Sequence, residues 1–69
     1  MPPYLTVEEF YSTKLYELDN SVYNPIERAF CKFLGENGKK FLYKHLDLTV
    51  AQLSANSGVD VMSCFKILA

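Results

Sequence analysis

The sequence has no long apolar run, few cysteines and a single histidine. Each shortage excludes a class of protein. A membrane-spanning helix needs about 18 or more consecutive apolar residues, and no such run occurs, so we expect no membrane segment. The first residues carry neither a basic start nor an apolar stretch, so no secretory signal is predicted. We therefore expect a cytoplasmic protein.

The residues used for metal, nucleotide and redox chemistry are also scarce. His45 has no cysteine at ligand spacing, so no metal site is predicted. Cys31 and Cys64 stand at apolar helical positions, where cysteine packs as a small hydrophobe, and we expect no disulfide between them. Gly35 and Gly38 lack the downstream Lys-Ser/Thr pair of a phosphate-binding loop. The sequence thus predicts no cofactor and no enzymatic activity.

The charge is nearly balanced, because 7 basic and 8 acidic side chains give a net charge of −1. Such a chain has no overall cationic field to attract a phosphate backbone. Any nucleic-acid role must therefore depend on a local patch. What the sequence does contain is apolar, with 49% hydrophobic residues that include five Phe and five Tyr. Its 69 residues are expected to form one domain with a limited core.

Capping signals divide the first half of the chain into helices. Thr6 and Glu9 match a capping box. The apolar spacing that follows predicts a first helix over residues 6–18. Its expected apolar face consists of Val7, Phe10, Tyr11, Leu15 and Leu18. Asn24 and Pro25 are typical of an N-cap and a first helical residue, so they predict the start of a second helix. The apolar stripe of that helix consists of Ile26, Ala29, Phe30, Phe33 and Leu34.

The second half of the chain is divided in the same way. Two glycines and the residues between them predict a turn over 35–38, and a short helix is expected over 39–46. Thr49 is the expected cap of a fourth helix, which Gly58 ends. Asp60 is the expected cap of the last helix. Because the sequence stops while this helix is still in progress, we expect it to be part of a longer chain.

The most informative pattern lies over residues 48–68. Ser54 is the small residue required where two helices cross closely, and Gly58 tolerates positive φ at the turn. Val59 is an apolar plug after the turn, and Asp60 caps the next helix. The shared core is completed by Leu53, Cys64 and Ile67. The pattern resembles the helix-turn-helix of bacterial regulators of the TetR-like and IclR-like families. More weakly, residues 26–38 resemble the first helix of a TetR-like domain.

This resemblance implies a DNA-binding surface, because in such proteins the second helix lies in the major groove. The residues it implies as exposed on that helix are Val61, Met62, Ser63 and Lys66, and the orientation of Phe65 stays open. Thr49 and Gln52 would approach phosphates from the start of the preceding helix. The resemblance thus predicts a unit that reads double-stranded DNA.

The chemistry of the expected DNA-reading helix is poor for that task. It carries one Lys and no Arg, Asn or Gln, the residues that make the usual bidentate contacts to bases. Three further cations, Lys39, Lys40 and Lys44, cluster before the fourth helix. A lysine patch of this kind would grip phosphates, which adds affinity without sequence choice.

The tyrosines indicate a second kind of surface. Tyr4, Tyr16 and Tyr23 are expected around the first helix, and exposed tyrosines are favoured at protein interfaces. Packing at the edge of a small core would explain the same residues equally well. Both readings stay open at this point.

The sequence therefore predicts an all-α fold, a small bundle of four to five short helices with a C-terminal helix-turn-helix. The leading functional prediction is a small DNA-binding transcriptional regulator that dimerises through its first helix. The alternative is a protein-binding module, such as a small inhibitor or adaptor, that uses the same geometry without DNA, because a fold does not by itself imply a function.

Overall fold

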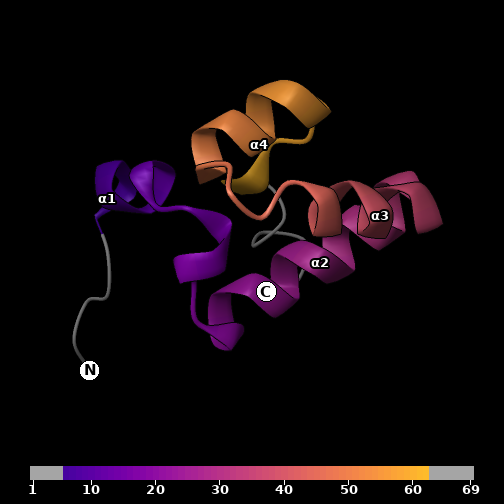
Figure 1. Cartoon of the computed structure of the whole chain (residues 1–69), viewed down its shortest axis with the longest axis horizontal. Helices are drawn as coiled ribbons and strands as arrows, with labels where there is room; N and C mark the ends of the chain where they lie inside the picture. The colour runs from indigo at the N-terminus through magenta and orange to yellow at the C-terminus, as the bar shows by residue number, and fades with distance from the viewer. Residues whose placement is uncertain (1–5, 63–69) are drawn as a thin grey trace.

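The computed structural model describes residues 6–62, and within them it confirms the predicted all-α fold. In chain order the elements are α1 (Val7–Ser12), the 3-10 turn η1 (Leu15–Glu17), α2 (Asn20–Leu34), α3 (Glu36–Lys44) and α4 (Val50–Ser57). α2 packs mainly on α3, and α1 packs on α4, so α1 and α3 lie toward opposite ends of the long axis (Figure 1). No helix of this part of the chain is long and apolar enough to cross a membrane.

The start of α1 confirms the predicted capping box. The Thr6 hydroxyl oxygen accepts a hydrogen bond from the Glu9 amide at 3.1 Å. In return, the Glu9 carboxylate accepts one from the Thr6 amide at 3.0 Å. Phe10 is buried, but Val7 is 60% exposed, so the prediction that Val7 lies on the apolar face is wrong. The short helix turns Phe10 and Tyr11 toward the core instead.

The predicted first helix over residues 6–18 is wrong beyond Ser12, because the rest of that range pairs with the segment before α4. The Leu15 amide donates to the Leu48 carbonyl at 2.9 Å. The Tyr16 amide donates to the Leu46 carbonyl at 3.0 Å. In a continuous helix these amides would bond within the helix, so the distant partners replace helical bonds. The pairing fastens the start of α4 beside η1.

α2 begins more than a turn earlier than the predicted start at Asn24 and Pro25. The Asp19 carboxylate accepts hydrogen bonds from the Ser21 amide and the Ser21 hydroxyl, both at 2.8 Å, and so caps the helix. Pro25 consequently lies inside α2, where its missing N–H removes one helical hydrogen bond. The early start brings Val22 against the core, which favours the Asp19 cap over the Asn24 cap.

The junction between α2 and α3 is a single glycine rather than the predicted turn over 35–38. Gly35 has φ +66° and ψ −151°, and α3 begins at the next residue, Glu36. Gly38 is therefore helical, and a Cβ on it would overlap the backbone carbonyl of Phe30 in α2. The predicted helix over 39–46 is confirmed as a helix, with an earlier start and an end at Lys44.

The core is assembled from every element of the described chain. Its fully buried side chains are Phe30, Leu15, Ile26, Leu42, Leu53, Val50 and Val61. α2 contributes the largest of them, Phe30, and α4 contributes Val50 and the predicted core residue Leu53. The start of α4 and the turn that follows it are thus held rigidly against the rest of the molecule.

Candidate nucleic-acid interface

α4 starts at a second capping box, which contains both residues predicted to approach phosphates. The Thr49 hydroxyl oxygen accepts a hydrogen bond from the Gln52 amide at 3.2 Å. The Gln52 side-chain oxygen accepts one from the Thr49 amide at 3.0 Å. The capping box does not use the side-chain nitrogen of Gln52, which is a donor on an exposed residue. This nitrogen is therefore a hydrogen-bond donor at the surface beside the start of α4.

The turn after α4 has the features predicted from its sequence. Gly58 ends the helix in the left-handed conformation, with φ +76° and ψ +5°. The Ser54 hydroxyl donates to the Val59 carbonyl at 2.8 Å, and the Ser57 hydroxyl oxygen accepts from the Val59 amide at 3.1 Å. Val59 packs against the core as the expected apolar plug. The turn is therefore a defined structure with hydrogen bonds on both sides of Gly58.

The chain becomes helical again at residues 61–62, after a further N-cap at Asp60. The Asp60 carboxylate accepts a hydrogen bond from the Met62 amide at 3.2 Å, as expected for an N-cap. Val61 is completely buried, so the prediction that it is exposed toward DNA is wrong. The residue points inward because it completes the core shared with α4. Met62 is 36% exposed and remains available at the surface.

The other residues predicted on this helix lie outside the described residues. This applies to the expected DNA contacts Ser63 and Lys66 and to the expected core residues Cys64 and Ile67. The described part of the motif therefore consists of α4, the turn and the first residues after the Asp60 cap.

The three lysines of the predicted patch lie on α3, and all are exposed. Lys40 and Lys44 are four residues apart, which places them on the same face of the helix. The ammonium of Lys39 lies over the ring of Tyr43, 5.8 Å from its centroid, a cation–π arrangement. The patch thus divides into Lys40 and Lys44 on the solvent face and Lys39 beside Tyr43.

Sequence reasoning missed a polar cluster between α2 and α3. Glu27 of α2 hydrogen-bonds Tyr43 of α3, and this bond is the main reason why the pKa of Tyr43 is raised. Burial is the largest cause that raises the pKa of Tyr23 to about 12, and the negative charge of Glu27 is the next largest. On each helix the two members lie four residues apart, Tyr23 with Glu27 and Lys39 with Tyr43, but only the packing of α2 on α3 brings the pairs together.

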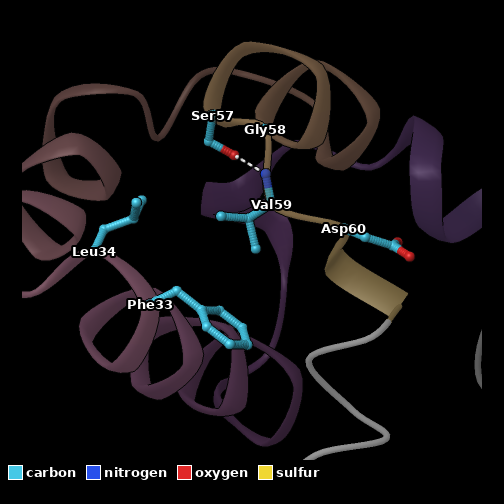
Figure 2. Close-up of a pocket in the computed structure, with 6 residues that line it drawn as sticks. All are labelled: Phe33, Leu34, Ser57, Gly58, Val59 and Asp60. Atoms are coloured by element: carbon cyan, nitrogen blue, oxygen red, sulfur yellow. Dashed lines mark hydrogen bonds between the residues drawn. The ribbon is translucent and has the colours of Figure 1, made fainter.

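A groove of about 360 Å³ lies between the end of α2 and the turn after α4. Its lining residues are Phe33, Leu34, Ser57, Gly58, Val59 and Asp60. Figure 2 shows the Val59 side chain pointing from the turn toward Phe33, while the Asp60 carboxylate points away. Phe33 and Leu34 are 46% and 40% exposed, so the prediction that they lie on the buried stripe of α2 is wrong. They form one wall of the groove instead.

The predicted interface tyrosines lie in different environments. Tyr16 in η1 is 63% exposed, and Tyr23 in α2 is half-buried. Tyr4 lies outside the described residues. Tyr43, which was not among the predicted interface tyrosines, is 55% exposed on α3.

Comparisons with protein-family models, with curated proteins and with solved structures find no match to this chain. Over residues 6–62, no group of three or more His, Cys, Asp or Glu side chains could hold a metal ion.

Proposed function

We propose that this chain is a DNA-binding helix-turn-helix domain of a small transcriptional regulator. The observation that carries the proposal is the arrangement around Gly58: a capped α4, a left-handed glycine, and a second helix start capped by Asp60. In DNA-binding proteins of this kind, the second helix enters the major groove while the first crosses the phosphate backbone. The buried Val61 fixes the start of the second helix against α4.

Contacts to the phosphate backbone would come from α4 and α3. The side-chain nitrogen of Gln52 lies at the N-terminal end of α4, where the helix dipole also favours an anion. Lys40 and Lys44 add positive charge on the solvent face of α3, which is joined to α4 by the short segment 45–49. Such contacts position a protein on DNA without reading its sequence.

Base contacts would begin at Met62, the exposed residue after the buried Val61. A methionine can contact the methyl group of thymine but offers no bidentate hydrogen bonds. Ser63 and Lys66 are the further candidates from the sequence. We therefore expect a binding free energy dominated by phosphate contacts, with a modest preference among DNA sequences.

The test is a titration of labelled duplex DNA, followed by fluorescence anisotropy at several salt concentrations. We expect binding at low salt that weakens as salt rises. Replacing Lys40 and Lys44 by Ala should make the slope of log K against log salt shallower by roughly 2, since each phosphate contact contributes about 0.9. Lys32→Ala is the matched control, because Lys32 is an exposed lysine on α2 outside the predicted patch. The absence of binding at low salt, or binding unchanged by salt, would contradict the proposal.

A second candidate function is protein binding, which the exposed aromatic residues favour. Tyr16 and Tyr43 are 63% and 55% exposed, and such residues are enriched at interfaces. The partner would be another protein, or a second copy of this chain that pairs around α1 and η1. Sedimentation equilibrium tests whether two copies of this chain pair. The homodimer would be supported by a dimeric wild type that becomes monomeric with Tyr16→Ala and stays dimeric with Glu17→Ala. A chain that stays monomeric at high concentration would exclude the homodimer.

A further inference from the structure

Tyr43 is an exposed aromatic residue that lies among the three lysines of α3. Its side chain is 55% exposed, more than any other aromatic side chain of α2 or α3. Lys39 and Lys40 precede it by four and three residues, and Lys44 follows it directly. Because residues three and four positions apart are neighbours on a helix surface, the ring lies within a patch of positive charge. The proposed contacts to duplex DNA use lysines of this patch but not the ring.

Two contacts hold the Tyr43 ring in place. Its hydroxyl donates a hydrogen bond to the Glu27 carboxylate of α2. The Lys39 ammonium lies over the ring, 5.8 Å from its centroid. Since more than half of the side chain is nevertheless exposed, the ring still offers apolar surface to a ligand. A ring that is fixed beforehand loses little conformational freedom when a ligand binds, so these contacts favour binding.

The charges around the ring favour a ligand that carries phosphates. At about 100° per residue, Lys40 and Lys44 lie on one side of Tyr43 around the helix. Lys39 and Gly38 lie on the other side, and Gly38 is the residue that packs against α2. Phosphates beside Lys40 and Lys44 are therefore directed away from α2 and from the carboxylate that holds the ring.

We infer that Tyr43 is a stacking platform for an unpaired base of single-stranded nucleic acid, with Lys40 and Lys44 beside it to hold adjacent phosphates. Proteins that bind single strands combine cations that follow the backbone with aromatic rings on which bases stack. Lys40 and Lys44 are about 6 Å apart along the helix axis. This distance is close to the length of two stacked nucleotides, at about 3.4 Å each. The site thus fits a short stretch of DNA or RNA.

Single-strand binding at Tyr43 goes beyond the proposed function, because its ligand differs from the duplex expected at the helix-turn-helix. A base inside a duplex must first leave its stack before it can contact a protein ring, which costs free energy. Both ligands would use Lys40 and Lys44, but only the single strand would use the ring. Substitution of Tyr43 therefore separates the two kinds of binding.

The first test is a titration of the full chain with labelled oligomers of thymidine and of uridine, and with a duplex of the same length, followed by fluorescence anisotropy. We expect Tyr43→Leu to weaken single-strand binding by roughly 10-fold. Duplex binding should change by less than about 2-fold, because its phosphates contact the lysines. Tyr43→Phe keeps a ring and should bind single strands like the wild type. Tyr16→Leu, at the exposed tyrosine of η1, is the matched control and should do the same.

Two outcomes of this titration would overturn the inference. One is a wild type that binds neither single strand at low salt. The other is single-strand binding that Tyr43→Leu leaves unchanged, which would assign the exposed ring to the protein interface considered above. Binding of one oligomer and not of the other would support the site and identify its ligand as DNA or RNA.

The second test reads stacking directly through tyrosine fluorescence. The chain contains five Tyr and no Trp, so its emission comes from tyrosine. An unlabelled single strand should quench part of the wild-type emission, because a stacked base contacts the Tyr43 ring. Tyr43→Phe should still bind but lose this quenching, whereas Tyr16→Phe should keep it. Quenching that persists in Tyr43→Phe would overturn the inference.

The salt dependence separates the lysines from the ring. Replacing Lys40 and Lys44 by Ala should make the single-strand slope of log K against log salt shallower by roughly 1.4, since each phosphate contact contributes about 0.7. Tyr43→Leu should lower the affinity and leave this slope unchanged. Single-strand binding without duplex binding would contradict the proposed function alone. Duplex binding with no effect of Tyr43→Leu on single strands would contradict this inference alone.

Discussion

At the scale of single residues, Gly38 sets how closely α2 and α3 approach each other. A Cβ at this position would overlap the carbonyl oxygen of Phe30 and lie 3.0 Å from the Cβ of Leu34. The overlapping oxygen belongs to a helical backbone and has no flexible side chain that could move aside. Gly38 is needed for this contact, whereas Gly35 is needed for its positive φ and has no neighbour within 4 Å of the added atom.

We therefore predict that Gly38→Ala destabilises the fold. Alanine gains up to about 1 kcal/mol of helix propensity over glycine, but overpacking of a tight contact costs about 1–3 kcal/mol. Because the overlapping atom belongs to the backbone, the free-energy cost of overpacking should exceed the gain in helix propensity. The thermal midpoint should then fall by roughly 5–10 °C. Asn37→Ala, at the exposed neighbouring position, is the control and should not lower the midpoint. Equal thermal midpoints for Gly38→Ala and Asn37→Ala would mean that α2 and α3 can move apart without a cost in free energy.

The capping carboxylates make the fold sensitive to acid. Hydrogen bonding from the Thr6 amide, and then from the Thr6 hydroxyl, lowers the pKa of Glu9 from its ordinary value of 4.5. Since the folded pKa is below the unfolded one, this contribution to stability is present above pH 4.5 and is lost as pH falls below it. Asp19, whose pKa is lowered mainly by the Ser21 hydroxyl, behaves in the same way below pH 3.8.

We predict that Glu9→Gln weakens the acid dependence of stability. The Gln side chain keeps an oxygen that can accept the Thr6 amide but does not titrate. Circular dichroism melts of the wild type and of this variant should therefore converge as pH falls from neutral to below 4.5. Glu8→Gln is the control, because Glu8 lies in the same turn but outside the capping box. If the difference in thermal midpoint between wild type and Glu9→Gln stayed constant with pH, the acid dependence would not come from the Glu9 carboxylate.

At the scale of elements, the packing of α2 on α3 produces a polar cluster at one edge of a largely apolar contact. Tyr23 and Glu27 come from α2, and Lys39 and Tyr43 come from α3. Partial burial and the Glu27 charge hold Tyr23 in its neutral form up to a pKa of about 12. The ordinary value is 10.0, so unfolding releases a proton in the intervening range.

We predict that alkali unfolds the chain partly through Tyr23. Since its folded pKa is above the unfolded one, the contribution is fully present below pH 10 and is lost as pH rises toward 12. Tyr23→Phe should therefore lose less stability than the wild type over this range, measured by thermal midpoints. Tyr16→Phe should keep the wild-type dependence, because Tyr16 is 63% exposed. Phenolate absorbance gives an independent check: Glu27→Gln should lower the pKa of Tyr23 and of Tyr43.

Pairing between segments, rather than helix propensity, decides where the first element ends. The amides of Leu15 and Tyr16 bond to carbonyls of the segment before α4, and the amide of Val50 donates to the Thr13 carbonyl at 2.9 Å. These bonds divide a range with helical apolar spacing into α1 and η1. The spacing of apolar residues cannot predict where this helix ends, because the competing acceptors lie 30 or more residues away in the sequence.

At the scale of the whole molecule, a small core joins all the elements. α1 and α4 pack together on one side, α2 and α3 on the other, and Phe30 is the largest completely buried side chain (Figure 1). A chain of 69 residues at about 0.05–0.15 kcal/mol per residue has a total stability of roughly 3–10 kcal/mol. The free-energy cost of a single large cavity is therefore comparable with the total stability of the fold.

We predict that Phe30→Ala leaves a large fraction of the chain unfolded at room temperature. Removing a buried Phe side chain costs about 3–5 kcal/mol. Far-ultraviolet circular dichroism should show reduced helix content and a urea transition shifted toward zero. Phe30→Leu should retain a cooperative transition, and Tyr16→Ala at the surface should be close to wild type. A fully folded Phe30→Ala chain would show that the elements do not share one core.

The sequence by itself determined the all-α class, the capping box at Thr6, the cap at Thr49 and the left-handed glycine at Gly58. These features depend on donors and acceptors a few residues apart, so local chemistry is sufficient for them. The plug Val59 was predictable for the same reason, because it belongs to the compact turn after Gly58. For the proposed DNA-binding surface, the sequence predicted which residues take part, but it placed Val61 on the exposed side, where the structure buries it.

Only the tertiary structure decided the end of α1 at Ser12, the start of α2 after the Asp19 cap and the burial of Val61. In each case two local alternatives were open, and a partner distant in sequence selected between them. Pairing with the segment before α4 interrupted the first helix, and core packing of Val22 favoured one cap over another. The inward orientation of Val61 depended on the core that it completes, because periodicity alone does not say which face of a helix meets its neighbours.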